Sequence, residues 1–385
     1  MIYRIIIAIL SISYSMVSFA EYNYKKIEEN GHVIHLLIID PSEYKASVVS
    51  AHNQVFGREK VGDIAKRENA DIAINAGFFE IGDNQDGRPT GTLVSNGQIY
   101  GLRTTKHACF VKNGNKYSVE MISPSMVVLI AGKEHKISGF NKFARGSRFY
   151  YYNNNWGKTT LSSFGDRNEI AIDQENKIIE VAQHGNISIP YKGYAVSFPK
   201  DIDISHIKVG SKVNFKWTPE YIINTDNFAI MGIPTLILDG KIRDGLSDNH
   251  RHSRTAIGTR QDGKLVIAVA EHVYKSDVSD ISIFEVRKIM EKENISVSKA
   301  TLSDLKTVLQ NNLHSSSGSI GLTTKELAQF MLKQNCVSAI NLDGGGSSTL
   351  YINGKYINQT IGDKDEAAGQ KVVRPVSDAI VFKKK

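Results

Sequence analysis

Cysteine is scarce in this sequence, whose 385 residues include only Cys109 and Cys336. Two thiols are too few for a disulfide-stapled scaffold or a cysteine-rich zinc cluster, so both classes are excluded. In an oxidising compartment the two residues could form a disulfide. Two buried, unpaired small side chains fit the sequence equally well, so the sequence leaves the choice open.

Long apolar runs are absent after the first twenty residues, so no later segment is a candidate for a membrane-spanning helix. The N-terminal stretch MIYRIIIAILSISYSMVSFA has one cation, Arg4, then an apolar block, and the small residues Ser18 and Ala20. This pattern predicts a signal peptide cleaved after Ala20 and a periplasmic or secreted protein without a stable membrane span. A permanent anchor is the weaker interpretation, because the apolar block is short and contains serines.

Clusters of lysine and arginine interleaved with aromatic residues are also lacking, which argues against a nucleic-acid partner. The chain has 47 basic and 40 acidic side chains, and its net charge of +7 would become +6 if Arg4 left with the leader. A moderate positive charge favours anionic partners, including phosphorylated glycans and membrane surfaces. The composition, with 41% hydrophobic and 23% charged residues, is otherwise that of a globular protein.

Short apolar or alternating stretches separated by polar turns predict many strands. The pairs Asn96-Gly97 and Asn353-Gly354 each lie between two such stretches and predict tight hairpins. We therefore expect an α+β fold with mixed, mainly antiparallel sheets and a few packed helices. The expected strands include residues 33–39, 46–51, 72–75, 265–270, 339–342 and 379–382, with further strands between 169 and 217.

A helical pattern is clearest over residues 322–335, where Thr323 and Glu326 form a capping box. A second helical zone, at about 273–318, has serine- and lysine-rich joints and resembles an insertion. We therefore expect a signal peptide at 1–20 and a single domain at 21–385 that carries this insertion.

The stretch INLDGGGSSTL combines an acid, Asp343, with three glycines and hydroxyl residues. A Walker-type phosphate loop would open a helix and end in Gly-Lys-Ser/Thr, and both features are lacking, so nucleotide binding of that kind is disfavoured. Two interpretations remain. The amides of Gly344, Gly345 and Gly346 could cradle an anion beside Asp343, or the glycines could form a bulge where two strands cross.

A second polar cluster begins with INAGFF, in which Asn75 ends an apolar strand and Gly77 helps to turn the chain. An amide side chain at such a position must find hydrogen-bond partners or destabilise the fold. Contact with a ligand and a structural tie to the following loop are equally compatible with the sequence of Asn75.

The third cluster, HRHSRTAIGT, places Arg254 at the start of an apolar strand. A planar guanidinium makes two hydrogen bonds to a phosphate or carboxylate, so a held arginine suits an anionic ligand. Glu271 directly follows the strand at 265–270, as Asp343 follows the strand at 339–342.

Four motifs, INAGFF, SRTAIGT, GLTTKELAQFM and AINLDGGGSSTLYING, occur in this order and strongly resemble the phosphodiester glycosidase family. The resemblance extends from about residue 33 to 382, and DGGGSST is its most specific part. The chain departs from the family in two places: Ser253 stands where proline is usual, and the 273–318 zone is longer than in compact bacterial members. The longer zone leaves substrate identity open, because an insertion near a site reshapes its mouth.

The resemblance implies hydrolysis of the bond between a sugar anomeric carbon and a phosphodiester oxygen, in a glycan or glycoconjugate. Asp343 is then the first candidate for the carboxylate that acts at the anomeric carbon, and Glu271 the second. Arg254 and the amides of the glycine loop would stabilise the departing phosphate. The predicted substrate-binding residues are Asn75, Gly77, His252, Thr255, Gly344, Gly345, Gly346, Ser347 and Ser348.

Two other functions remain open. A serine hydrolase would use Ser347 or Ser348 with His252 or His272 as base, although a Gly-x-Ser-x-Gly elbow is lacking. A non-catalytic cell-envelope glycan-binding protein would keep many of the same residues, because binding and catalysis share them.

No cofactor is firmly implied. Asp343, Asp239 and Asp244 could meet a Ca2+ or Mg2+ ion, but no ligand spacing in the sequence demands one. The oligomeric state also stays open.

Overall fold

Strands dominate the architecture. The computed structural model describes residues 22–130, 132–162, 166–272, 290–291, 295, 301, 320–360, 362–365 and 370–385. Within these residues two α-helices are present, α1 (Val61–Arg67) and α4 (Thr324–Lys333). The fold is therefore mostly β rather than α+β. The helical zone expected at 273–318 lies outside the described residues, apart from 290–291, 295 and 301. Almost all strand pairs are antiparallel, as predicted, and β10 with β11 is the parallel exception among the pairs described.

Two sheets carry the strands nearest to the candidate site. Sheet A has the order β1 (Tyr22–Glu29), β2 (His32–Ile39), β20 (Leu265–Ala270), β19 (Arg254–Arg260), β21 (Cys336–Asn341), β17 (Thr235–Leu238) and β18 (Lys241–Ile242). Sheet B has the order β23 (Lys355–Tyr356), β22 (Leu350–Ile352), β4 (Ile72–Asn75), β26 (Asp378–Lys384) and β3 (Tyr44–Ser50).

Two further sheets complete most of the molecule. Sheet C has the order β6 (Gln98–Gly101), β5 (Leu93–Ser95), β16 (Phe228–Met231), β7 (His107–Asn113) and β8 (Lys116–Ile122). Sheet D has the order β13 (Ile178–Ala182), β12 (Arg167–Ile172), β14 (Tyr194–Pro199), β11 (Phe149–Asn153), β10 (Lys133–Phe140), β9 (Ser125–Ile130) and β15 (Asn214–Thr218). Shorter elements are β24 (Asp363–Asp365), β25 (Gln370–Val372) and the 3-10 turns η1 (Ala51–Asn53), η2 (Asp83–Gln85), η3 (Glu220–Ile223) and η6 (Gly345–Ser347).

Sheets A and B pack face to face and are covered on their outer faces by one helix each. Alternate residues of β20 show why its sequence is apolar throughout: Ile267 lies in the core shared with sheet B, whereas Val266 faces α4. In β26, Ile380 joins the shared core and Val381 faces α1. A strand buried on both faces needs apolar residues at every position, which explains the unbroken runs in the sequence.

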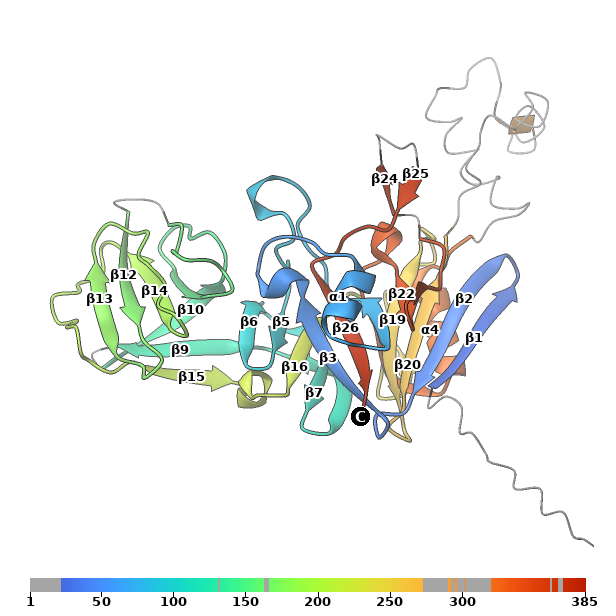
Figure 1. Cartoon of the computed structure of the whole chain (residues 1–385), viewed down its shortest axis with the longest axis horizontal. Helices are drawn as coiled ribbons and strands as arrows, with labels where there is room; N and C mark the ends of the chain where they lie inside the picture. Colours follow the sequence, from blue (N-terminus) through green and yellow to red (C-terminus); the bar gives the residue numbers. More distant parts are fainter. Residues whose placement is uncertain are drawn as a thin grey trace, which may run out of the picture.

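Sheet D lies at the far side of the molecule from sheets A and B, on the left in Figure 1, and sheet C lies between them. Met126, Ile170 and Phe198 of sheet D belong to a core that also includes Val111 and Ala229 of sheet C. The candidate site residues come from sheets A and B, so sheet D contributes none of them.

Local sequence signals predicted several elements correctly. Asn96-Gly97 joins β5 to β6, and Asn353-Gly354 joins β22 to β23. The capping box is present at α4, where Glu326 N donates to Thr323 Oγ1 (3.1 Å) and Thr323 N donates to Glu326 Oε2 (2.9 Å). No helix among the described residues is long and apolar enough to cross a membrane.

Candidate active site

The candidate residues gather at one end of sheets A and B, where strand ends meet. In an antiparallel sheet the end of one strand lies beside the start of the next. Arg254, which begins β19, pairs with Ala270 at the end of β20, and Asn341 at the end of β21 pairs with Ala256 of β19. Glu271, Arg254 and Asp343 therefore lie on three neighbouring strand ends of sheet A.

Sheet B adds an acid that the sequence interpretation missed. Asp378 begins β26, next to Ala379, which pairs with Asn75 at the end of β4. It is fully buried, Gly77 N donates to its Oδ1 (2.5 Å), and Ser377 Oγ donates to its Oδ2. Its signal in the sequence is an acid directly before the predicted strand at 379–382, whereas Asp343 and Glu271 directly follow predicted strands. Gly77 thus binds Asp378.

Asn75 ties the two sheets together beneath the site. Its Nδ2 donates to the carbonyl of Asp343 (2.7 Å), and its Oδ1 accepts from Thr255 Oγ1 (2.8 Å) and Thr349 N (3.0 Å). Asn75 is 1% exposed and Thr255 is fully buried. Of the two roles that the sequence left open for Asn75, these bonds support the structural tie, and the substrate contacts of Asn75 and Thr255 stay predictions.

Asp343 and Asp378 form an electrostatically coupled pair across the two sheets. Burial raises the pKa of Asp343 above its usual range, although the Ser347 hydroxyl, the Gly344 amide and the Arg374 guanidinium act in the opposite direction. Burial also raises the pKa of Asp378 to about 6 despite hydrogen bonds from Ser377 and Gly77, and the charge of Asp343 raises it further. Two such carboxyl groups hold protons at higher pH than isolated aspartates do.

Arg254 is held in place by main-chain carbonyls. Its Nε donates to the carbonyl of Leu322 (3.1 Å) and its Nη2 to the carbonyl of His250 (3.0 Å). Burial lowers the pKa of this half-buried guanidinium. Among the described residues, no carboxylate forms an ion pair with Arg254, and its Nη1 donates no hydrogen bond. The side chain is therefore oriented while its charge stays available for an anion.

Several amides of the glycine loop are already hydrogen-bonded within the protein, which leaves fewer of them for the anion cradle that the sequence suggested. Gly344 N donates to Asp343 Oδ1 (2.9 Å), Gly345 N to the carbonyl of Ser253 (2.8 Å), and Ser347 N to the carbonyl of Gly344 (3.2 Å). These three amides bond oxygens of the protein and stabilise the loop, in which η6 forms a tight turn. The loop positions Asp343, and the available positive charge comes from arginine.

Close packing explains why glycine is needed in this loop. A Cβ on Gly344 would lie 2.8 Å from the carbonyl of Ser253, and a Cβ on Gly346 would lie 2.5 Å from the guanidinium carbon of Arg374. Arg374 is a second cation near Asp343. The sequence did not predict this role, because Arg374 lies outside all four motifs of the family resemblance.

Glu271, the second candidate for the catalytic acid, is 7% exposed and tied to other groups. Its Oε1 accepts from His35 Nε2 (2.7 Å) and from Gln359 N (2.7 Å), and Tyr24 OH bonds the other ring nitrogen of His35 (2.9 Å). Because β19 separates β20 from β21, Glu271 lies about 10 Å from the strand end that carries Asp343.

Among the described residues, the hydrogen bond that a serine hydrolase needs between its serine and its histidine is not present. Ser347 and Ser348 are fully buried, and neither hydroxyl is hydrogen-bonded to a histidine. The rings of His252 and His272 lie 6.3 Å apart, and His252 is exposed. A nucleophilic serine needs a base within hydrogen-bond reach, so this arrangement does not support that chemistry.

Two of the three proposed metal ligands, Asp239 and Asp343, lie at opposite ends of one strand. Asp239 lies in the β17–β18 turn, where Gly240 N bonds the carbonyl of Val337 near the start of β21. Asp343 follows the opposite end of β21, so the two aspartates cannot share an ion. In the part of the chain that the structure describes, no three His, Cys, Asp or Glu side chains are grouped to hold a metal.

The structure thus divides the predicted substrate-binding residues by accessibility. Asn75, Gly77, Thr255, Gly346, Ser347 and Ser348 are buried, and the first three have identified structural partners. The partly or fully exposed candidates at this end of the sheets are His252, Arg254, Asp343, Gly344 and Gly345.

Comparisons with known proteins decide the family. A sequence profile described as phosphodiester glycosidase matches residues 200–301 and 307–383. Over 34 residues the chain is 59% identical to the human N-acetylglucosamine-1-phosphodiester alpha-N-acetylglucosaminidase, a stretch that covers 9% of this chain and 7% of the human protein. The chain belongs to the phosphodiester glycosidase family. An uncharacterized protein of Rickettsia conorii is 34% identical over 283 residues, covering 70% of this chain and 99% of the relative.

Solved structures share the fold of this phosphodiester glycosidase family member. A hypothetical protein from Synechocystis aligns with a TM-score of 0.67 and 19% identity, over 94% of this chain and 61% of that chain. A putative exported protein from Burkholderia pseudomallei aligns with a TM-score of 0.63 and 17% identity, over 91% of this chain and 74% of that chain. The chain spans about three fifths of the Synechocystis protein and a small part of the human enzyme.

Proposed function

We propose that this protein is an exported hydrolase that cleaves the bond between a sugar anomeric carbon and a phosphodiester oxygen in a glycan or glycoconjugate. The observation that carries the proposal is Arg254, an oriented guanidinium without a carboxylate partner among the described residues. It lies on the strand between those that lead to Glu271 and Asp343, and beside the loop of Asp343. Membership of the phosphodiester glycosidase family supports the reaction type.

The leaving group determines what the site must supply. A phosphate monoester departs as a stable anion, so stabilising its charge matters more than protonating the leaving oxygen. Arg254 presents its free Nη1 edge to that charge, in a half-buried setting where electrostatic interactions are stronger than in water.

Asp343 is the carboxylate placed to act at the anomeric carbon. It is partly exposed, and the Gly344 amide fixes its Oδ1. As a carboxylate it either attacks the anomeric carbon or activates a water molecule there. Asp378 is fully buried and cannot touch a substrate in this arrangement, so it acts as a positioning residue through Gly77 and through its coupling to Asp343.

Export is the second part of the proposal, and the leader sequence supports it. The apolar block after Arg4 and the small residues before Glu21 form a cleavable signal. N-terminal sequencing of protein from the native host tests this directly. A mature chain that begins near Glu21 is expected, and a chain that retains Met1 would contradict export by signal cleavage.

The test of the catalytic proposal is sugar release by purified mature protein from a sugar 1-phosphodiester, compared with the Asp343→Asn variant. The asparagine keeps the shape and the bond to Gly344 N but lacks the charge, so kcat should fall by roughly a factor of 100 to 10,000. Substrate binding, measured by calorimetry, should persist or tighten, because an anion no longer faces the phosphate.

Each alternative gives a different result. Wild-type protein that binds the phosphodiester without releasing sugar would indicate a glycan-binding protein instead of an enzyme. Near-normal turnover in Asp343→Asn would shift the catalytic role to Glu271, and Glu271→Gln would then be the variant to compare. Circular dichroism and thermal melts of each variant keep loss of folding apart from loss of chemistry.

A further inference from the structure

Two adjoining cavities open at the end of sheet A opposite to the candidate active site. They have volumes of about 890 Å³ and about 440 Å³ and share the lining residues Pro41, Asn115 and Tyr117. The larger one is also lined by Arg260, which ends β19, whereas Arg254 begins that strand. Six residues of strand span about 20 Å, so these cavities are separate from the proposed catalytic centre.

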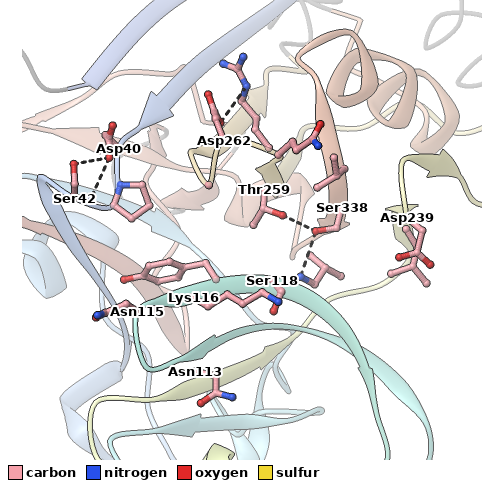
Figure 2. Close-up of a pocket in the computed structure, with 18 residues that line it drawn as sticks. Asp40, Ser42, Asn113, Asn115, Lys116, Ser118, Asp239, Thr259, Asp262 and Ser338 are labelled. Atoms are coloured by element: carbon pink, nitrogen blue, oxygen red, sulfur yellow. Dashed lines mark hydrogen bonds and ion pairs between the residues drawn. The ribbon is translucent and has the colours of Figure 1, made fainter.

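The larger cavity is lined by polar groups from several turns. Figure 2 shows Asn115 and Lys116 of the β7–β8 hairpin, with Asp40 and Asp239 on opposite sides of the opening. Asn113, Asn115 and Gln261 contribute side-chain amides whose hydrogen-bonding groups have no partner among the described residues. Amides on several sides of one cavity suit a ligand that carries many hydroxyl groups.

The charges around this cavity largely compensate one another. Asp262 Oδ1 lies 3.7 Å from Arg260 Nε, and Asp40 Oδ2 lies 3.9 Å from Lys264 Nζ. Beneath them, the hydroxyls of Thr259 and Ser338 bond each other (2.7 Å), and Pro41 and Tyr117 supply apolar surface. A nearly neutral wall of amides and hydroxyls beside apolar patches matches the alternating hydroxyl and C–H faces of a saccharide.

The smaller cavity is basic. Lys112 is only 6% exposed, and its ammonium donates one hydrogen bond among the described residues, to the carbonyl of Asp226 (2.7 Å). The Asp226 carboxylate forms an ion pair with Lys45 Nζ (2.7 Å), and Lys385 lines the same cavity. Lys45, Lys112 and Lys385 thus line one cavity with a single side-chain carboxylate, that of Asp226, and Lys112 retains two N–H donors. Buried lysine is rarely left in this condition without an anionic partner.

We propose that these cavities form a second binding site for a phosphorylated saccharide, with the sugar in the larger cavity and its phosphate against Lys112. The oxygens of a phosphate can accept from the remaining N–H donors of Lys45, Lys112 and Lys385, whose ammonium groups each make one bond within the protein. The choice of phosphate over other anions rests on the proposed function, because a polymeric sugar phosphodiester would carry such groups beyond the bond being cleaved. The site would then hold a distant part of the substrate.

Calorimetry with glucose 1-phosphate on full-length mature protein tests the proposal, with Asp343→Asn as the background so that no hydrolysis occurs. Two sites per chain are expected. Lys112→Met should abolish one of them or weaken it by about tenfold or more, and Lys45→Met, which keeps Lys112, should weaken the same site by about threefold. Lys216→Met is the matched control, because Lys216 forms an exposed ion pair with Glu134 in sheet D. It should bind as the background does.

Other probes separate the chemical contributions. Glucose 1-phosphate should bind at the Lys112 site more tightly than glucose or inorganic phosphate alone. Equal binding of glucose would overturn the role of phosphate, and equal binding of glucuronate would overturn the preference for phosphate over carboxylate. Equal binding of inorganic phosphate would overturn the saccharide part.

The number of sites distinguishes this inference from the proposed function. One site that is lost in Lys112→Met would support the second site and count against binding at the catalytic centre. One site that is insensitive to both Lys112→Met and Lys45→Met, but lost in Arg254→Met, would overturn the inference and leave the proposed function standing. Thermal melts confirm folding, and Lys45→Met serves if Lys112→Met does not fold.

Discussion

Arg254 shows how a single side chain can be fixed and still remain available. The carbonyls of Leu322 and His250 occupy its Nε and Nη2, and a planar guanidinium can satisfy both while presenting a further edge. Lysine keeps the charge but not this geometry. Arg254→Lys should therefore lower kcat/KM for a sugar phosphodiester by about 10- to 100-fold with little change in Tm. Steady-state kinetics and a thermal melt measure both, and equal kcat/KM in the two proteins would mean that Arg254 is merely a solvated strand-end residue.

Asp378 should make stability depend on pH. Its folded-state pKa of about 6 is above the usual value of 3.8, so the folded protein holds this proton more tightly than the unfolded chain does. That contribution is fully present below about pH 4 and is lost as pH rises through 6. A difference of about two pKa units corresponds to roughly 3 kcal/mol. Asp378→Asn, which can still accept from Gly77 N, should lack this loss.

Urea unfolding of wild type and Asp378→Asn from pH 4 to pH 8 measures the effect as a difference between the two proteins. As pH rises, the free energy of unfolding of the variant should increase relative to that of wild type. A difference that stays constant across this range would show that Asp378 titrates normally despite its burial.

Two glycines of the same turn are needed for different reasons. Gly345 has φ of +60° and open space around its missing Cβ, whereas a Cβ on Gly346 would meet the Arg374 guanidinium at 2.5 Å. Gly345→Ala should therefore cost about 1 kcal/mol through backbone strain alone and retain most activity. Gly346→Ala should displace Arg374 and lower kcat, because Arg374 favours the charged form of Asp343. Kinetics and urea melts of the two variants test this, and equal loss of kcat in both would contradict it.

The sequence predicted elements well where the signal is local. The Asn-Gly pairs correctly predicted two hairpins, and the capping box correctly predicted the start of α4. The strands predicted at 72–75 and 265–270 have the same bounds in the structure. Helix α1 was missed, because seven residues give too little periodicity to recognise.

The candidate site was less predictable, because its partners come from distant strands. Asp343, Arg254 and Glu271 were found at strand ends from their own motifs. The roles of Asn75 and of the loop amides depended on Thr255, Thr349 and Ser253, which pair with them only after the sheets assemble. Asp378 shows the general reason: at one edge of antiparallel sheets, residues that begin strands count as much as residues that end them.

At the scale of the whole molecule, sheets A and B carry two polar regions at opposite ends of the same strands. The buried middle of β19 and β21 separates the Arg254 end from the Arg260 end. Because both faces of these strands are packed, the middle offers no polar surface to a ligand. A substrate that used both ends would have to be a chain long enough to pass around the sheet, which favours a polymeric glycan over a small metabolite.

The reactivity of the two cysteines depends on whether sheets A and C are folded. Cys109 lies in β7 of sheet C and Cys336 in β21 of sheet A, and both are buried free thiols, so the alternative of a disulfide left open by the sequence is resolved. Burial raises the pKa of Cys336 to about 12, against the opposing effect of Arg260, and burial with the nearby Glu120 raises the pKa of Cys109 well above its usual value.

Thiolate is the reactive form of cysteine, and neither thiol ionises appreciably near neutral pH in this environment. The native protein should therefore react negligibly with an aromatic disulfide reagent at pH 8, and two thiols should become reactive in guanidinium without added reductant. Because no covalent link is lost, dithiothreitol should leave both Tm and sugar release unchanged. Cys109→Ala, which should expose a single thiol on unfolding, is the control for the count. Zero reactive thiols in the unfolded wild type, together with a lower Tm in reductant, would instead mean that export oxidises Cys109 and Cys336 to a disulfide.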